Sequence, residues 1–436
     1  MGKKLLLTIL LLLFGITEVF AATEFIVTVK SSGGDYTTLQ SAETGIQNDL
    51  TSATIKVFSI SAYTTPTLVA GDTVLGQAST ATGVVVLVNA ARTQVLIKTI
   101  AVAAFQSGEV VQKTTDAGVT VTLSNAGDSP IIGIACYSSA APDGAATIDG
   151  SVSSATNYIK IYTPTSERHL GVYNTSKYRI ETTNNTIPLV VKDPFVRVDG
   201  LQFYLQSSNA ANPRIVQFYA TGGTVGEVAN NVVYFTNNII RGHTNSTQTG
   251  FEGVQIYQAG SGTSNAYVYN NLIYDIVSSG DAAETGLDVN DSAFNFYIYN
   301  NTFVGIGARG ITAGASTTKT MRNNLFSGSG TIDINGTVND TSGNNSTTRA
   351  SIGYTCSPGA CSGDRTSQTF TFVNSGASDW HLASTDAGAR NYGAELSGTF
   401  TTDIDGQTRP GESVWDIGMD EVFPRTLRSN SGEGWE

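Results

Sequence analysis

The chain has little charge, little cysteine and little histidine, and each shortage argues against a class of protein. Only 14% of its 436 residues are charged, and the formal net charge is −12. No basic stripe is present, which argues against a nucleic acid as the partner. The three histidines are scattered, and no His or Cys spacing matches a metal site. No ten-residue helical period is found, so we expect a mostly β chain.

Only the first residues contain a long apolar run, and they have the pattern of a secretion signal. Lys3 and Lys4 precede the run Leu5–Phe14, and Val19–Ala21 supplies a cleavage site. The run is too short for a membrane anchor, and no cysteine follows it as a lipoprotein would require. We therefore expect residues 1–22 to be a cleaved signal peptide. The mature protein is then secreted or at the cell surface, extracellular or periplasmic.

The cysteines have different expected roles. Cys356 and Cys361 bracket Ser-Pro-Gly-Ala. They could close a small disulfide in an oxidising compartment or remain two free thiols. Cys136 ends the apolar strand Ile131–Cys136, and we expect it to be a buried small hydrophobic residue.

Asparagine pairs recur, each inside nearly the same apolar phrase. The second asparagines are separated by 33, 30 and 23 residues; they are Asn238, Asn271, Asn301 and Asn324. Repetition at this period predicts a solenoid with one structural coil per repeat. We expect the amides of these asparagines to form a hydrogen-bonded ladder at one corner of successive coils.

Each coil is predicted to contain three short strands. Apolar and polar residues alternate before and after each asparagine pair, which predicts two strands meeting at a corner. A third strand lies between pairs, usually after a glycine at a bend; its copies are Gly253–Ile256, Gly286–Val289, Gly310–Ala313 and Thr331–Ile334. Three strands per period make a parallel β-helix. The inward apolar column is expected to contain Ile239, Leu272, Phe303 and Leu325.

The remaining segments are assigned around this solenoid. We expect residues 23–65 to form an N-terminal cap and first coil, with a short helix capped by Thr37 or Thr38 and Thr54–Phe58 as a first coil strand. Residues 66–126 contain a duplication of their own and predict an inserted small β module. The β-helix is assigned to residues 127–345, a C-terminal closure to 346–423 and a disordered tail to 424–436.

The asparagine phrases resemble the right-handed parallel β-helix repeat of the pectin-lyase-like superfamily, secreted bacterial type. The segments Asp379–Leu382, Asp403–Gly406 and Asp416–Gly418 are similar to the ending of many secreted bacterial β-helix proteins, and Gly33–Leu39 is similar to their beginnings. The insert resembles glycine-acid repeat modules of phage and bacterial surface proteins. The resemblance implies an all-β, three-sheet right-handed parallel β-helix with a short N-terminal helical cap and an inserted small β domain.

The same resemblance implies an extracellular polysaccharide or cell-surface glycan as the partner. The superfamily includes polysaccharide lyases, hydrolases, esterases and adhesins, and fold alone does not select among them. No characterised lyase or hydrolase signature is matched, so enzyme and binder both stay open. The alternative is a non-catalytic cell-surface adhesin or fibre-like structural protein with the insert as its contact module.

The resemblance also implies that the sheet of third strands holds the site. Its expected outward residues are Gln255, Asp288, Thr312 and Asp333. For hydrolysis, the carboxylates Asp288 and Asp333 would flank a glycosidic bond from strands about 9.6 Å apart. For β-elimination, bound Ca²⁺ would neutralise a uronate while Arg309 takes a proton.

Neighbouring side chains complete this predicted site. The expected substrate-binding residues are Glu252, Gln255, Asp281, Glu284 and Asp291, and any tyrosine facing outward beside Gln255 could stack on a sugar. Alternatively, these charges only solubilise the face. The aspartates 403, 405 and 420 could hold Ca²⁺ or cap a turn.

Overall fold

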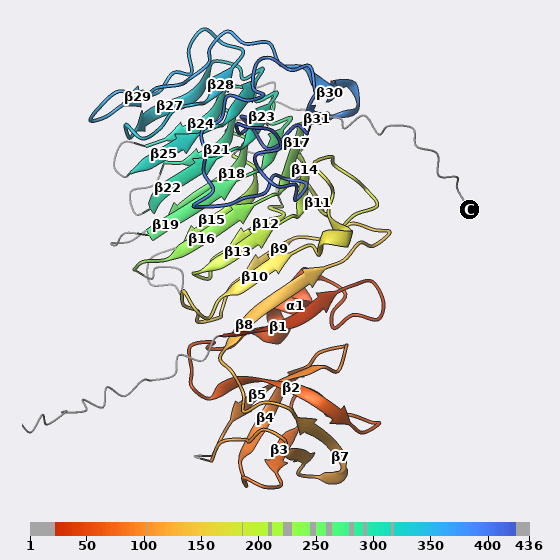
Figure 1. Ribbon diagram of the computed structural model, residues 1–436. Helices are drawn as coiled ribbons and strands as arrows, with labels where there is room; N and C mark the ends of the chain where they lie inside the picture. Colours follow the sequence, from red (N-terminus) through yellow and green to blue (C-terminus); the bar gives the residue numbers. More distant parts are fainter. Residues whose placement is uncertain are drawn as a thin grey trace, which may run out of the picture.

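The computed structural model describes residues 22–423 apart from 102, 185, 208–211, 221–228, 245–249, 259–263, 279–282, 291–293 and 315–317. The predicted tail lies outside the described residues, as does the predicted signal peptide except for residue 22. Figure 1 shows a tall stack of parallel strands with a smaller barrel beyond its N-terminal end. Among the described residues, no helix is long and apolar enough to cross a membrane.

The stack consists of three parallel sheets, each listed here in spatial order. Sheet 1 contains β1 (Thr23–Val29), β8 (Pro130–Cys136), β10 (Ile159–Tyr162), β13 (Val196–Asp199), β16 (Val232–Thr236), β19 (Ser264–Tyr269), β22 (Phe294–Tyr299) and β25 (Lys319–Arg322). Sheet 2 contains β11 (Ile180–Thr183), β14 (Gln202–Ser207), β17 (Ile239–Thr244), β20 (Leu272–Tyr274), β23 (Thr302–Val304), β26 (Leu325–Ser327) and β28 (Ser346–Thr347). Sheet 3 contains β9 (Ala146–Ile148), β12 (Leu189–Val191), β15 (Arg214–Ala220), β18 (Glu252–Gln258), β21 (Thr285–Val289), β24 (Arg309–Ala313), β27 (Ile332–Val338) and β29 (Thr355–Cys356). Regular coils pass from sheet 1 to sheet 2 to sheet 3, which confirms the predicted right-handed parallel β-helix.

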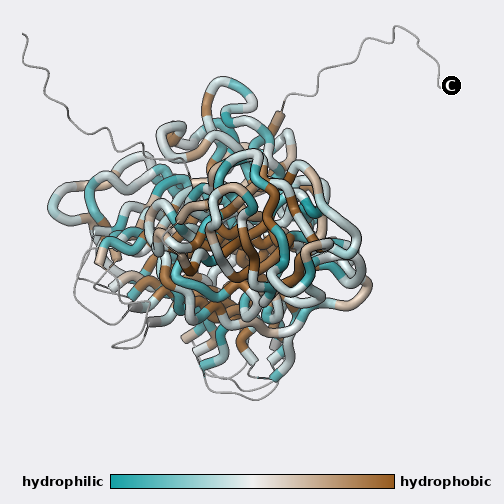
Figure 2. The backbone as a smooth tube through the Cα atoms, turned by 90° about the horizontal axis from the view of Figure 1, so that it is seen from below, coloured by the Kyte–Doolittle hydropathy of each residue, from teal (hydrophilic) through white to brown (hydrophobic). Residues whose placement is uncertain are grey.

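Apolar side chains fill the space between the three sheets. Figure 2, viewed from below, shows hydrophobic residues at the centre and hydrophilic ones toward the outside. The strand register places similar side chains above one another in successive coils. Phe303 and Phe326, for example, lie with their ring centroids 4.9 Å apart. The inward column of sheet 2 is Ile240, Ile273, Phe303 and Phe326.

The predicted inward column was therefore wrong at three of its four positions. Ile239, Leu272 and Leu325 share their register with Thr302, and they contact apolar residues of the C-terminal segment instead. The physical reason lies in the corner. The first asparagine of each pair adopts a left-handed backbone, with φ of 56° at Asn237, and the second asparagine takes the inward position. The residue after the pair consequently faces outward.

The second asparagines form a continuous buried ladder. Asn271 donates from its backbone N–H and its Nδ2 to Oδ1 of Asn301, at 3.1 and 2.9 Å. Asn238 donates in the same way to Asn271, and Asn301 to Asn324. Each Nδ2 also reaches a main-chain carbonyl, as from Asn301 to Val268 at 2.9 Å. The ladder therefore satisfies main-chain groups that would otherwise be buried without partners at the corner.

The ladder is longer than the four pairs detected in the sequence. Asn324 donates to Oδ1 of Asn345, and Asn345 donates to Oδ1 of Asp364. Asn344 and Asn345 are a fifth pair, but Ser346 and Thr347 follow it. The apolar phrase that follows the other pairs is missing there, so the sequence repeat does not mark this pair.

The first asparagines of the later pairs hold the C-terminal segment against the solenoid. Their Nδ2 atoms donate to its carbonyls, from Asn270 to Thr402 at 2.7 Å and from Asn323 to Ala394 at 2.8 Å. Asn300 donates to the carbonyls of Asp416 and Gly418, both at 2.9 Å. Residues 389–423 thus cover the outer face of sheet 2 (dark blue in Figure 1) rather than only closing the end of the stack.

The N-terminal end is covered by the predicted helix. Helix α1 (Leu39–Ile46) begins after Thr38, whose Oγ1 accepts a hydrogen bond from the N–H of Ser41 at 3.1 Å. Its apolar face is buried in the solenoid core. Gln40 Oε1 accepts the N–H of Thr147 in β9 at 2.8 Å. The helix therefore protects a strand edge that would otherwise be open to pairing.

The insert is a closed antiparallel barrel, which confirms a small β domain. Its strands, in spatial order, are β2 (Ile55–Tyr63), β5 (Gln94–Thr99), β4 (Thr82–Val88), β3 (Thr73–Gly76), β6 (Val110–Lys113) and β7 (Asp116–Leu123). The segment Thr54–Phe58, predicted as a coil strand, therefore belongs largely to the barrel. Ile55, Val57 and Leu96 also join the solenoid core, so the barrel seals the end of the stack as well as filling its own centre.

The last coils are irregular. A disulfide joins Cys356 and Cys361 beside the end of the core, and Cys136 is buried and unpaired. The outlying elements are η1 (Thr165–Glu167), β30 (Phe372–Asn374), η2 (Ser375–Ala377) and β31 (Asp379–Leu382). Strands β30 and β31 form a small antiparallel hairpin.

The ladder leads to a stability prediction. Replacement of Asn301 by alanine leaves the buried N–H of Asn271 without its acceptor, so unfolding should require about 2–3 kcal/mol less. The control Asn295→Ala removes an amide from the outer face, where it donates to Asn265 at 3.3 Å; it should change stability by less than about 0.5 kcal/mol. Urea denaturation followed by far-UV circular dichroism measures both. Equal losses in the two variants would contradict a special role for the ladder.

Candidate functional sites

The outer face of sheet 3 carries a row of polar side chains. Near its start, each of these strands directs two successive residues inward, for example Gly253 and Val254 in β18. The register places Gln217, Gln255, Asp288 and Thr312 in one column on successive strands. Gln217 Nε2 donates to Gln255 Oε1 at 2.8 Å, and Gln255 Nε2 donates to Asp288 Oδ2 at 3.5 Å. Gln255, Asp288 and Thr312 thus lie where the sequence analysis expected them.

Asp333 does not belong to this column. Its place in the column is taken by Asn335, and Asp333 is aligned with the inward bend residue Gly310. Its side chain is fully buried, and its Oδ2 accepts a hydrogen bond from Thr347 at 2.6 Å. Burial raises the pKa of Asp333 to about 6. The predicted pairing of Asp288 and Asp333 across a glycosidic bond was therefore wrong, because the bend directs Asp333 into the interior.

Glu252 and Arg214 form an ion pair at the edge of this face. Arg214 Nε lies 2.8 Å from Glu252 Oε2. Burial raises the pKa of Glu252 to about 7; Arg214 opposes the rise, and the charge of Asp288 adds to it. The carboxyl group of Glu252 therefore titrates near neutral pH. A second carboxylate, Asp288, lies on the neighbouring strand.

The other predicted residues are distributed differently. Arg309 shares its register with Thr285 on the neighbouring strand, so it lies on the same sheet as Asp288. Glu284 is buried, and its Oε1 accepts hydrogen bonds from the N–H and hydroxyl of Ser278. It is held inside the loop and does not line the face. Residues 281 and 291, the predicted Asp281 and Asp291, lie outside the described residues.

Two tyrosines extend the polar face. Tyr219 and Tyr257 stack with ring centroids 6.0 Å apart and an angle of 19° between their planes. Tyr257 is 43% exposed and lies two residues beyond Gln255 on the same strand. The sequence predicts a stacking tyrosine here, and Tyr219 and Tyr257 are among its strand tyrosines, but it does not identify Arg214 and Gln217 as part of the face. Strand β15 lacks an asparagine pair before it, so its register with β18 could not be counted from the repeat.

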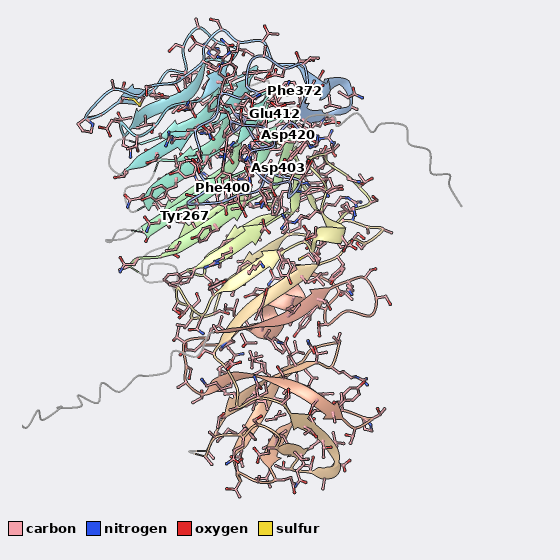
Figure 3. All side chains as sticks on the ribbon, viewed as in Figure 1. Tyr267, Phe372, Phe400, Asp403, Glu412 and Asp420 are labelled. Atoms are coloured by element: carbon pink, nitrogen blue, oxygen red, sulfur yellow. A yellow bond between two sulfur atoms is a disulfide. The ribbon has the colours of Figure 1, made fainter. Side chains whose placement is uncertain are left out.

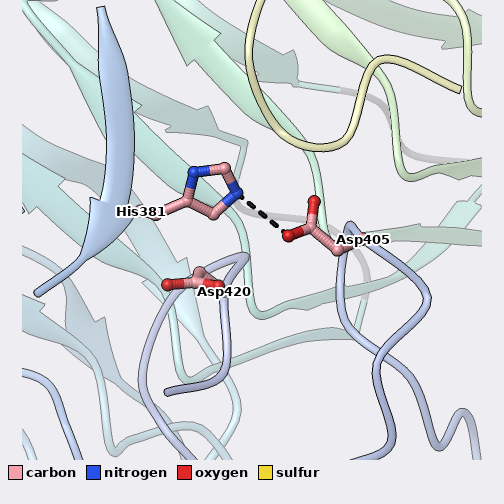
Figure 4. Close-up of side chains that lie close together, drawn as sticks. All are labelled: His381, Asp405 and Asp420. Carbon is pink, nitrogen blue, oxygen red and sulfur yellow. Dashed lines mark ion pairs between the residues drawn. The ribbon is translucent and has the colours of Figure 1, made fainter. Parts of the chain in front are cut away.

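A second cluster of ionisable groups lies in the C-terminal segment. Donor atoms of His381, Asp405 and Asp420 lie within 4.8 Å of one another, beside a cleft of about 300 Å³. Figure 4 shows the His381 ring directed at Asp405, and Figure 3 shows Asp403 and Asp420 in the same part of the molecule. His381 Nδ1 is 2.6 Å from Asp379 Oδ1, and Nε2 is 3.2 Å from Asp405 Oδ2.

This cluster supplies its own cation. Burial alone would lower the pKa of His381, but Asp405, Asp420 and Asp379 outweigh it and raise the pKa to about 10. The imidazolium therefore neutralises the carboxylates at neutral pH. Ca²⁺ prefers an all-oxygen set of ligands, and a histidine nitrogen is not one of them.

The aspartate predicted beside it as a Ca²⁺ ligand also has another role. Asp403 Oδ1 accepts the N–H groups of Asp405 and Gln407, at 3.0 and 2.8 Å, and its Oδ2 accepts the N–H of Glu421 at 3.2 Å. These bonds make it the cap of a turn. For Asp403, the hydrogen bonds therefore favour the turn cap over the alternative of a Ca²⁺ ligand.

The buried carboxyls of the C-terminal segment predict a pH-dependent stability. Burial raises the pKa of Asp403 and of Asp416 to about 7. A carboxyl whose folded pKa is raised contributes stability below its unfolded pKa near 4, and this contribution is lost as pH rises through the folded value. The melting temperature should therefore be higher at pH 5 than at pH 8.

Two variants test the source of this effect by scanning calorimetry. Asp416→Asn removes one titrating carboxyl, so it should flatten the decline between pH 5 and pH 8. Asp340→Asn, at an exposed position, should leave the decline unchanged. A melting temperature that rises from pH 5 to pH 8 would contradict the assignment.

Comparisons with known proteins assign no family to this chain. No protein-family model matches the chain. No curated protein sequence matches it either. Among solved structures, the chain is similar to pectate lyase Pel9A at 11% sequence identity, with 67% of this chain and 88% of that chain covered and a TM-score of 0.27. A likeness at this level carries no argument about activity, and the fold rests on the strand topology described above.

Proposed function

We propose that this is a secreted protein that binds an extracellular polysaccharide on the outer face of sheet 3. The observation that carries the proposal is the stacked pair of the half-buried Tyr219 and the exposed Tyr257 beside the hydrogen-bonded row Gln217, Gln255 and Asp288. Sugars offer apolar C–H faces and a rim of hydroxyls. Aromatic rings next to amide and carboxylate groups match both features.

Secretion is the part of the proposal that rests on the N-terminal sequence. Lys3, Lys4 and the following apolar run have the pattern of a signal peptide. The disulfide between Cys356 and Cys361 supports the same compartment, because such bonds persist mainly in oxidising environments.

The binding proposal is tested by removing the exposed ring. Tyr257→Ala should weaken binding to the polysaccharide that wild type selects from a glycan array by about tenfold, since the stacking surface is lost. Tyr63→Ala is the matched control: Tyr63 is 47% exposed but lies on the barrel. Titration by isothermal calorimetry gives both affinities. Equal affinity of Tyr257→Ala and wild type would place the glycan elsewhere.

A catalytic role on the same face is the second candidate, and the pKa of Glu252 near 7 favours it. A protonated Glu252 could donate its proton to the leaving glycosidic oxygen. Asp288 would take a proton from the attacking water, so that the glycosidic bond breaks with net addition of water. A lyase would instead use a base such as Arg309 and leave an unsaturated product.

If Glu252 is the catalytic acid, replacing its carboxyl group by an amide should lower turnover strongly. Glu252→Gln keeps the size of the side chain but removes the acid, so release of reducing ends should fall by about 100-fold or more. Glu181→Gln is the control, because Glu181 also pairs with an arginine, Arg179 at 2.7 Å, but on sheet 2. Reducing-end and unsaturated-product assays are run together. Unchanged turnover in Glu252→Gln would eliminate it as the acid.

The non-catalytic adhesin or fibre alternative is favoured by the barrel surface. Val69 and Ile100 are 57% and 65% exposed there, in a domain that lies at the end of the stack (Figure 1). Exposed apolar side chains on the barrel, at the end of the solenoid, are typical of a surface that contacts another protein or a cell surface. Glycan binding that is lost with the barrel substitutions Val69→Ser and Ile100→Ser, but kept in Tyr257→Ala, would favour this alternative.

A further inference from the structure

The cluster of His381, Asp405 and Asp420 in the C-terminal segment has the composition of a transition-metal site. One donor atom from each residue lies within 4.8 Å of the other two, and Figure 4 shows the three side chains converging on one space. An imidazole together with carboxylates is a donor set that suits Zn²⁺ and related divalent ions. The histidine therefore distinguishes this cluster from an ordinary acidic patch.

The histidine ring is held in the orientation that a metal ligand requires. Asp379 Oδ1 lies 2.6 Å from His381 Nδ1, and it also accepts the main-chain N–H of His381 at 3.2 Å. The other ring nitrogen, Nε2, is thereby directed at Asp405. A carboxylate on the far nitrogen is the usual partner of a metal-binding histidine, because it fixes the ring and makes the ligating nitrogen more basic.

Several donor atoms of the cluster are buried without a well-formed hydrogen bond. His381 Nε2 lies 3.2 Å from Asp405 Oδ2, but the contact does not have the geometry of a hydrogen bond. Asp405 Oδ1 is buried and has no hydrogen-bond partner among the described residues. Asp420 is only 5% exposed, and its Oδ2 accepts the N–H of Leu382 at 2.7 Å, which leaves Oδ1 for another partner. Buried polar atoms normally have partners, so these atoms indicate a ligand.

The surrounding chain leaves these donor atoms accessible. Gly171, with φ of 70°, passes so close that an added Cβ would lie 2.2 Å from His381 Nε2 and 3.1 Å from Asp405 Oδ1. Because glycine has no side chain, both atoms stay uncovered. A cleft of about 300 Å³ is lined by all three residues of the cluster and by Gln407. An ion and its water ligands can therefore reach the cluster from solvent.

We propose that His381, Asp405 and Asp420 bind one divalent transition-metal ion of the Zn²⁺ type, with Asp379 as a positioning residue. His381 Nε2 and one oxygen of each aspartate coordinate the ion, and water from the cleft completes the coordination. The ion takes the place of the proton on Nε2, so it neutralises the carboxylates that the imidazolium neutralises in its absence. This site does not depend on the proposed function of sheet 3.

The bound ion would stabilise the C-terminal segment. Its three ligands come from strand β31, from the turn that contains Asp405 and from the stretch that contains Asp420. These pieces are separate in the sequence and belong to the segment that packs against sheet 2. An ion that binds the folded chain and joins all three pieces raises the stability of the folded state by mass action.

The experiment titrates Zn²⁺ by isothermal calorimetry into the untagged mature chain, after metal has been removed with EDTA and the EDTA dialysed away. Wild type should bind one Zn²⁺ per chain with a Kd below about 1 µM, and Ca²⁺ about 100-fold more weakly. Asp405→Asn and His381→Gln each remove a ligand, so each should lower the zinc affinity about 100-fold. Asp379→Asn should lower it about tenfold, because it loosens the ring but removes no ligand.

The matched control is His243→Gln, which removes an exposed histidine of sheet 2 outside the cluster and should leave the zinc affinity unchanged. Melting temperatures in EDTA show which variants are folded, and Asp405→Asn decides the test if His381→Gln does not fold. Excess Zn²⁺ should raise the melting temperature of wild type and of His243→Gln but not that of the ligand variants. The proposal is overturned if folded wild type binds no stoichiometric Zn²⁺, or if wild type and Asp405→Asn bind it equally.

Discussion

The buried asparagine ladder is the interaction on which the rest of this structure depends. Each amide of Asn238, Asn271, Asn301 and Asn324 joins its own coil to a neighbouring coil and also satisfies main-chain groups at the corner. Because a one-residue slip would break every bond in the row, the ladder holds all coils in one register. Columns of like side chains on the outer faces, polar on sheet 3 and aromatic on sheet 1, follow from that register.

Paired asparagines serve two structural purposes at one corner. The second member lies inside, and the first holds a left-handed backbone and binds the C-terminal segment through its amide. That segment covers the apolar outward residues of sheet 2, including Ile239 and Leu272. It also encloses charges that compensate one another, such as the fully buried pair of Arg409 and Glu421 at 2.9 Å. A buried pair of this kind depends on its surroundings, because loss of one member leaves an unpaired charge.

The C-terminal segment covers sheet 2 and also reaches sheet 1, where Phe400 stacks on Tyr269 with ring centroids 4.4 Å apart, so sheets 1 and 3 differ in what they expose. On sheet 3, Glu252 is paired with Arg214, and Tyr257 is largely exposed. On sheet 1, the rings of Tyr234, Tyr267 and Tyr297 cover one another. Sheet 3 therefore leaves an aromatic ring open to a ligand, whereas the rings of sheet 1 are covered by their neighbours.

The sequence by itself determined the repeat, the three strands of each coil, the corner with its asparagines and the capping helix, since these depend on residues close together in the chain. It also placed Gln255, Asp288 and Thr312 in one column, because the repeat interval sets their register. Only the tertiary structure decided those features that need contacts between segments far apart in the sequence. The bend that turns Asp333 inward, the ion pair of Arg214 with Glu252 and the burial of Ile239 under the C-terminal segment each need a second strand or segment to be in place. Local alternation carries no record of those neighbours.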